Sequence, residues 1–112
     1  MAKKLVALCA CPMGLAHTYM AAEAIEKAAK SLGYEVKVET QGAEGISNAL
    51  TEQDLREADL IITSLSITPE GYERFDEYDI YEVRLQDAIK DAKQVITQVA
   101  QMEEEYRRNN GH

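Results

Sequence analysis

The sequence lacks any long apolar run. Its longest apolar stretches, such as LVALCA and LIIT, fall far short of the roughly 20 residues that a membrane-spanning helix requires. The first residues, MAKK, lead directly into LVALCA, which is too short and too soon followed by polar residues to be a secretory signal. We therefore expect a cytosolic protein without a membrane span.

Basic residues are scarce compared with acidic ones. The chain has 12 lysines and arginines against 20 aspartates and glutamates, which gives a formal net charge of -8. Nucleic acid as a partner is disfavoured, because binding it requires a basic stripe or patch. A phosphate bound by this chain would be held by local backbone donors, since the overall charge repels it.

Cysteine is also rare, and cofactor motifs are missing. The two cysteines, Cys9 and Cys11, are spaced C-x-C, which makes no ordinary disulfide framework, and cytosolic thiols stay reduced. One nearby histidine adds too few ligands for a metal site. Neither the G-x-G-x-x-G dinucleotide motif nor the C-x-x-C redox motif is present. We expect no metal and no cofactor.

Apolar periodicity divides the chain into alternating strands and helices. At 112 residues and 46% hydrophobic composition, the chain fits one domain, which we place at residues 1–107, with 108–112 as a frayed tail. Gly33 is well placed to end the first helix. The predicted strands are Leu5–Ala10, Tyr34–Thr40, Leu60–Thr63 and Ile80–Val83, and the predicted helices are His17–Leu32, a short piece at 51–58, and Leu85–Arg107.

This alternation predicts an α/β fold with an open, four-stranded parallel sheet. Strands buried on both faces read as unbroken apolar runs, as the first and third do, whereas the second and fourth alternate. In the second strand, Val36 and Val38 are expected to point inward, and Glu35, Lys37 and Glu39 outward. The predicted order is 2-1-3-4, with helices on both faces in a Rossmann-like, three-layer arrangement. Ligands bind such sheets at the carboxyl ends of strands 1 and 3.

The stretch ALCACPMGLAHT leaves strand 1 at that position. A thiolate is the reactive form of cysteine, and a helix N-terminus lowers the pKa of a thiol because free backbone N–H groups point at the anion. Gly14 permits an unusual turn, so that N–H groups from Met13 to His17 converge on a phosphate. The pattern predicts a phosphate cradle around one nucleophilic cysteine.

Cys11 is the favoured nucleophile because it stands at the loop entrance, directly before Pro12. Cys9 lies inside the strand, where the alternative is a small buried packing residue. His17 is a candidate to assist the thiol or to donate to a phosphate oxygen; its alternative is a solvent-facing helix residue. Thr18 is a candidate phosphate donor or simply an N-cap.

Two further segments are expected as loops at the same sheet edge. They are Glu39–Gly42 after strand 2 and Thr63–Ser66 after strand 3, and their amide and hydroxyl groups are candidates to line the crevice. The alternative for Gly42 and Gly45 is a turn with no functional role.

A cysteine phosphatase of low molecular weight is the main competing function, because it also places a thiolate in a cradle after a strand. Such enzymes carry the motif C-x5-R followed by serine or threonine, whereas this chain has His17 at the position of the arginine. Without a guanidinium clamp, hydrolysis of a phosphoryl group is disfavoured. A regulatory domain that only binds partners is a third possibility.

The segment from Cys11 to Glu23, CPMGLAHTYMAAE, closely resembles the phosphocysteine loop and first helix of enzyme IIB in the fructose-type bacterial sugar phosphotransferase system. The later pieces VKVETQG, Ala58-Asp59 and Glu73-Arg74-Phe75 match the family in the same order. Two positions depart from it: Met13 stands where many relatives carry threonine or serine, and Ser66 where many carry aspartate.

The resemblance implies a phosphorelay step in which Cys11 takes a phosphoryl group from a phosphohistidine on enzyme IIA and donates it to a sugar entering through the membrane component, enzyme IIC. It implies a protein-phosphohistidine–sugar phosphotransferase, an open sheet of four parallel strands and a phosphorylated ketohexose-type product. The implied phosphate-binding residues are Pro12, Met13, Gly14, Leu15, Ala16, His17 and Thr18. The sequence assigns no role to Glu39, Gln41 or Ser66.

Overall fold

The computed structural model describes residues 3–10, 16–42, 45–65, 71–76, 78 and 80–109. Along the chain the elements are β1 (Lys3–Ala10), α1 (Ala16–Ser31), β2 (Tyr34–Gly42), β3 (Gly45–Ser47), α2 (Glu52–Glu57), β4 (Leu60–Leu65), the 3₁₀ helix η1 (Tyr72–Phe75), β5 (Tyr81–Glu82) and α3 (Leu85–Asn109). The strand and helix alternation expected from the sequence is present, with elements close to their predicted bounds.

The sheet has the order β3-β2-β1-β4-β5. Strands β2, β1, β4 and β5 are parallel, in the relative order expected, whereas β3 runs antiparallel to β2 at the edge. The prediction of four strands in the order 2-1-3-4 is therefore wrong at this edge. Strand β3 is only three residues long, and its first residue, Gly45, which has a φ of +98°, pairs with Gly42 at the end of β2.

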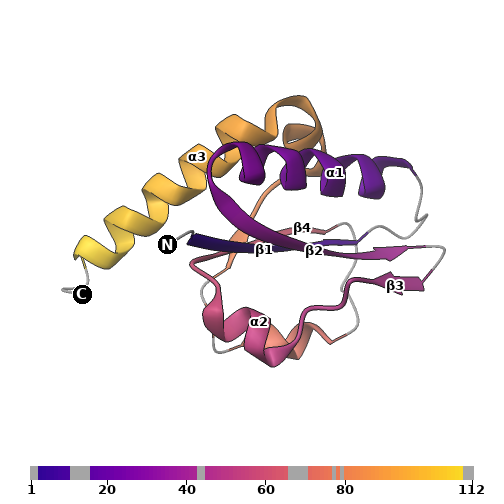
Figure 1. Cartoon of the computed structure of the whole chain (residues 1–112), viewed down its shortest axis with the longest axis horizontal. Coiled ribbons are helices and arrows are strands. Elements are labelled where there is room, and N and C mark those ends of the chain that lie inside the picture. The colour runs from indigo at the N-terminus through magenta and orange to yellow at the C-terminus, as the bar shows by residue number, and fades with distance from the viewer. Residues whose placement is uncertain are drawn as a thin grey trace.

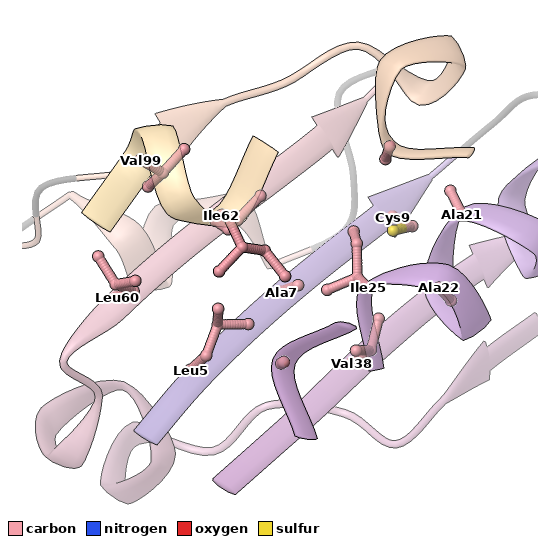
Figure 2. Packing of buried hydrophobic residues seen from close by; sticks show 13 residues of the cluster. Leu5, Ala7, Cys9, Ala21, Ala22, Ile25, Val38, Leu60, Ile62 and Val99 are labelled. Carbon is pink, nitrogen blue, oxygen red and sulfur yellow. The ribbon is translucent and has the colours of Figure 1, made fainter. Parts of the chain in front are cut away.

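Helices cover both faces of the sheet in three layers. Figure 1 shows α1 and α3 on one face and α2 on the other. On the first face, every second residue of β1 belongs to a hydrophobic cluster with residues of α1 and α3. Figure 2 shows these β1 residues, Leu5, Ala7 and Cys9, in the cluster. On the second face, Val6 and Leu8 pack against Leu55 of α2 and Phe75 of η1. Strand β1 is buried on both sides, as its unbroken apolar run predicts.

Helix ends follow local sequence signals. Gly33, with φ of +90°, follows α1 in the left-handed conformation that glycine adopts without strain. Thr51 caps α2 in a reciprocal capping box with Asp54. Helix α3 is broken at Asp91, whose φ is -157°, and the Asp91 carboxylate accepts a hydrogen bond from the backbone N–H of Gln94 at 3.2 Å, so it acts as the cap of the second segment. The second segment continues through Asn109.

Several local expectations are corrected. The segments expected as loops were Glu39–Gly42 and Thr63–Ser66; the first belongs to strand β2, and the described part of the second, Thr63–Leu65, belongs to β4. Glu39, expected to point outward, is buried. In a three-layer fold both faces of a central strand are covered, so alternation of polar and apolar residues does not imply exposure to solvent.

Candidate functional site

The carboxyl ends of β1 and β4 meet where the chain changes direction across the sheet. From β1 the chain passes through α1 to β2 on one side, and from β2 it returns through α2, on the opposite face, to β4 on the other side of β1. Ala10, the last residue of β1, pairs with Gln41 of β2 and with Leu65 of β4. This is the topological switch point at which open α/β sheets bind ligands.

The predicted nucleophile and most of its predicted cradle lie outside the described residues. They are Cys11, Pro12, Met13, Gly14 and Leu15, and Ser66 after β4 lies outside as well. Ala16, His17 and Thr18 begin helix α1, but their side chains are not described. The structure therefore fixes the two ends of the predicted loop: Ala10 at the end of the central strand and Ala16 at the start of a 16-residue helix.

Helix α1 is suited to an anion at its N-terminus. A helix N-terminus presents unpaired backbone N–H groups and the positive end of the helix dipole. The first turn of α1 contains no acidic residue that would occupy or neutralise this end. A phosphoryl group placed there meets favourable backbone electrostatics despite the net charge of -8.

Cys9 is a buried packing residue. Its side chain has no exposed surface, and it packs against α1, where Figure 2 shows Ala21 beside it. Burial raises the pKa of the Cys9 thiol to about 12. At neutral pH this thiol is protonated and a poor nucleophile, which agrees with the packing role expected for it.

Polar residues form two rows across the carboxyl half of the sheet. In one row, Cys9 of β1 lies between Thr40 of β2 and Ser64 of β4. In the row before it, Leu8 lies between Glu39 of β2 and Thr63 of β4. Among the described residues, the buried Thr63 Oγ1 and Ser64 Oγ have no hydrogen-bond partner. These hydroxyls are therefore polar groups inside the sheet immediately next to the switch point.

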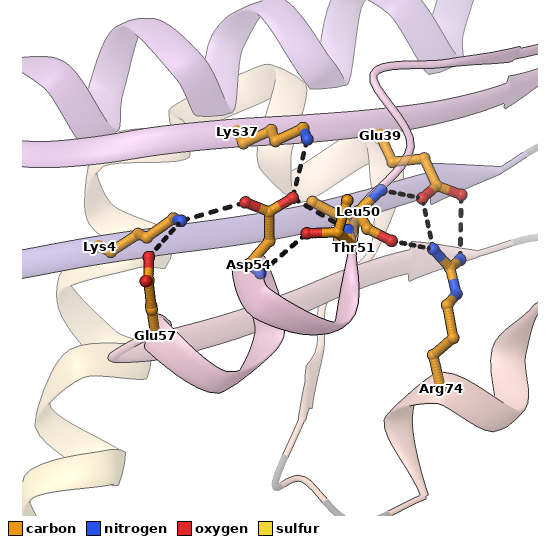
Figure 3. Close-up of polar contacts among 8 residues, drawn as sticks. All are labelled: Lys4, Lys37, Glu39, Leu50, Thr51, Asp54, Glu57 and Arg74. Atoms are coloured by element: carbon orange, nitrogen blue, oxygen red, sulfur yellow. Dashed lines mark hydrogen bonds and ion pairs between the residues drawn. The ribbon is translucent and has the colours of Figure 1, made fainter.

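Glu39 is the centre of a buried polar cluster that the sequence reasoning missed. Its carboxylate accepts hydrogen bonds from Gln41 Nε2 at 2.6 Å and from the backbone N–H of Leu50 at 2.7 Å. It also pairs with Arg74 in a two-point contact, Nη1 to Oε1 at 2.9 Å and Nη2 to Oε2 at 3.1 Å. Figure 3 shows this arrangement, apart from Gln41. Burial alone raises the pKa of Glu39, but these donors outweigh it and leave the pKa below its usual value, so the residue is ionised.

Arg74 is held as firmly as its partner. Its Nε donates to the carbonyl of Gly71 at 2.6 Å, its Nη1 also donates to the carbonyl of Leu50 at 2.7 Å, and its guanidinium carbon lies 5.3 Å from the centre of the Phe75 ring. Gly71 has a φ of +72°, and a Cβ there would lie 2.9 Å from Arg74 Nε. The only signal for this pair in the sequence was that both ETQG and ERF belong to the family pattern.

A second ionic cluster lies toward the amino ends of the same strands. Asp54 of α2 pairs with Lys37 at 2.8 Å and with Lys4 at 3.2 Å. Figure 3 shows both contacts. Lys37 pairs with Val6 of β1, whereas Glu39 pairs with Leu8. The cluster around Asp54 therefore lies two positions closer to the amino ends of the strands than Glu39 does. Within the described residues, no group of three or more histidine, cysteine or acidic side chains is arranged to hold a metal, and no helix is long and apolar enough to cross a membrane.

The chain matches a family model over residues 6–98, described as the lactose/cellobiose-specific IIB subunit of the phosphotransferase system (PTS). Curated relatives carry a fructose-like name. The PTS system fructose-like EIIB component 1 of Escherichia coli K12 is 62% identical over 102 residues, covering 91% of this chain and 94% of that protein. Component 2 of the same strain is 48% identical over 96 residues, covering 86% and 91%.

Solved structures agree in fold. The enzyme IIB subunit of the PTS from Escherichia coli K12 matches with a TM-score of 0.87 and 59% identity, covering 96% of this chain and 99% of that one. A domain of a fructose-specific IIABC component from Borrelia burgdorferi matches with a TM-score of 0.82 and 40% identity, covering 90% and 96%. This chain therefore belongs to the enzyme IIB family of the bacterial phosphotransferase system, among its fructose-like members, a family of transferases in sugar transport.

Proposed function

We propose that this chain is a cytosolic phosphocarrier in which Cys11 carries the phosphoryl group. The observation that supports this most strongly is the place of Cys11 in the chain: it directly follows the central strand β1 at the switch point, a few residues before helix α1 with its acid-free first turn. Cys9 is an unsuitable nucleophile because burial keeps its thiol protonated. Membership of the IIB family supplies the reaction class.

The proposed reaction has two phosphoryl transfers. In the first, the Cys11 thiolate attacks the phosphorus of a phosphohistidine on enzyme IIA; the S–P bond forms, the P–N bond breaks, and the histidine nitrogen keeps the electron pair. In the second, a hydroxyl of a fructose-like sugar held by the membrane enzyme IIC attacks the phosphorus; the S–P bond breaks, the thiolate is regenerated, and the hydroxyl proton passes to a base. Backbone N–H groups from Met13 to Thr18 hold the phosphoryl oxygens, and His17 assists.

Retention of the phosphoryl group is a part of the proposal. Hydrolysis by a cysteine phosphatase depends on an arginine that clamps the transferring group, and His17 occupies that position. The guanidinium of Arg74 is engaged by Glu39 and by two backbone carbonyls. We expect the phosphorylated protein to persist in water until an acceptor takes the group.

Two assays test the function. Incubation with phosphorylated enzyme IIA should add one phosphate to the wild type and to Cys9→Ser, but none to Cys11→Ser. A generic aryl phosphate should not be turned over. Turnover of the aryl phosphate that depends on Cys11 would favour the phosphatase, and a wild type that gains no mass would leave a binding domain as the better description.

A further inference from the structure

The Glu39–Arg74 clamp, defined as these two side chains with Gln41 and Leu50, is a buried polar arrangement that the transfer chemistry leaves unexplained. The Glu39 carboxylate receives four hydrogen bonds from three parts of the chain: β2 itself, the segment before α2, and η1. The side chain of Glu39 is 1% exposed and that of Arg74 25% exposed.

Stability alone does not explain such a pair. Removing two charges from water costs several kcal/mol per ion, and apolar side chains of similar volume are often as stabilising as a buried ion pair. What a two-point arginine–carboxylate contact adds is geometry, because the planar fork fixes both distance and orientation.

The clamp joins the two flanks of the strand that leads to Cys11. Glu39 faces Leu8 in the β1–β2 ladder, and Gln41 faces Ala10, the residue before Cys11. On the other side, Ala10 pairs with Leu65 of β4, and η1 follows β4 in the chain. Arg74 therefore connects the segment after β4 with β2, across the face of β1 that packs on α2.

We propose that Glu39 is a positioning residue for phosphoryl transfer, acting through Arg74. The clamp fixes the separation of β2 and η1 and so holds the carboxyl end of β1, from which the nucleophile emerges, in the geometry required for in-line attack. This inference rests on the proposed function of Cys11. It gives the ETQG and ERF motifs a common function, which is to position the carboxyl end of β1.

The consequence for kinetics is specific. Misplacement of a reacting group by a fraction of an ångström to an ångström slows a transfer step by roughly 10- to 100-fold. Glu39→Gln keeps the shape of the side chain but removes the charge and one acceptor of the fork. We expect it to lower the maximal rate of phosphoryl transfer from phosphorylated enzyme IIA by about 10-fold or more. The half-saturating donor concentration should be nearly unchanged, because the Glu39 side chain is buried and does not form part of the protein surface.

Asp54→Asn provides a matched control. It also breaks a partly buried ionic cluster between β2 and the α2 face of the sheet, but at the amino ends of the strands. A general loss of stability affects both variants, whereas a positioning effect appears only in Glu39→Gln. Arg74→Lys is the second test: it keeps the positive charge and removes the fork, so it should reproduce the slow transfer instead of rescuing it.

The experiment is rapid-quench transfer from phosphorylated enzyme IIA over a series of donor concentrations, with mass detection, at a temperature where thermal melting shows each variant folded. Slow transfer in Glu39→Gln and Arg74→Lys, with near-normal transfer in Asp54→Asn, supports the inference. Equal transfer rates in Glu39→Gln and Asp54→Asn overturn it. If Glu39→Gln does not fold, a normal transfer rate in Arg74→Lys overturns it. A wild type that accepts no phosphate overturns the proposed function itself, which is a different result.

Discussion

Cys9 of β1 stands directly opposite Ser64 of β4, and neither side chain has any exposed surface. The buried thiol is part of the apolar layer between the sheet and helices α1 and α3. The C-x-C pair thus separates into a packing residue, Cys9, and a candidate nucleophile two positions later, Cys11. This separation can be measured without any partner protein.

The first prediction concerns Cys9 and alkaline pH. An unfolded cysteine ionises with a pKa of about 8.5, whereas burial raises the pKa of Cys9 to about 12. Above pH ~9 the unfolded state loses this proton and the folded state keeps it, so stability is full below the unfolded pKa and falls as the pH rises toward the folded pKa. Urea unfolding should show a steeper loss between pH ~9 and ~11 in the wild type than in Cys9→Ala.

The slope, not the absolute stability, is the relevant quantity, because Cys9→Ala also leaves a small cavity. Other groups that titrate in this range are the same in both proteins. Curves of equal slope would show that the Cys9 thiol ionises freely in the folded state.

The second prediction concerns Asp54. Hydrogen bonds from Lys37, Thr51 and Lys4 hold the pKa of its carboxyl far below the usual value. Its contribution is therefore present above the unfolded pKa of about 3.9 and is lost as the pH falls below it. At neutral pH Asp54→Asn should lower the free energy of unfolding by about 1–2 kcal/mol, and acid should reduce this difference.

Glu52→Gln is the control for Asp54, because Glu52 lies in the same helix and pairs with Arg56 on the exposed surface. Its removal should leave urea unfolding nearly unchanged. If Glu52→Gln and Asp54→Asn had equal effects, the cluster with Lys4 and Lys37 would contribute nothing specific.

The third prediction compares two glycines. Both Gly71 and Gly33 have positive φ, so alanine at either is strained by about 1–2 kcal/mol. A Cβ at Gly33 meets nothing within 4 Å, whereas one at Gly71 would press on Arg74. Gly71→Ala should therefore cost more stability than Gly33→Ala and should also slow phosphoryl transfer.

Thermal unfolding and the transfer assay together check this comparison. Equal losses of stability, with transfer unaffected in both variants, would mean that Arg74 is free to move aside and that its position is not critical.

Much of the fold was predictable because apolar periodicity depends on local sequence. The unbroken run ending at Ala10 identified a central strand, and Gly33 marked the end of α1. Strand β3 was missed because three residues are too few to give a periodic signal, and its pairing with β2 depends on tertiary contact.

The candidate site was predictable only where its residues are adjacent in sequence. The stretch from Cys11 to Thr18 could be interpreted as a strand-to-helix loop, but the partner of Glu39 lies 35 positions away, in a 3₁₀ turn without periodicity. Alternation along β2 correctly placed Glu39 on the face opposite Val36 and Val38, but it predicted that this face is exposed to solvent. That this face is covered by α2 and η1 follows only from the assembled three layers.

The most direct test of the central claim is mass mapping of the phosphorylated residue after incubation with phosphorylated enzyme IIA. We expect a single phosphate on Cys11, present in the wild type and in Cys9→Ser and absent in Cys11→Ser. A phosphate found on His17 or on Cys9, or one that remains in Cys11→Ser, would contradict it.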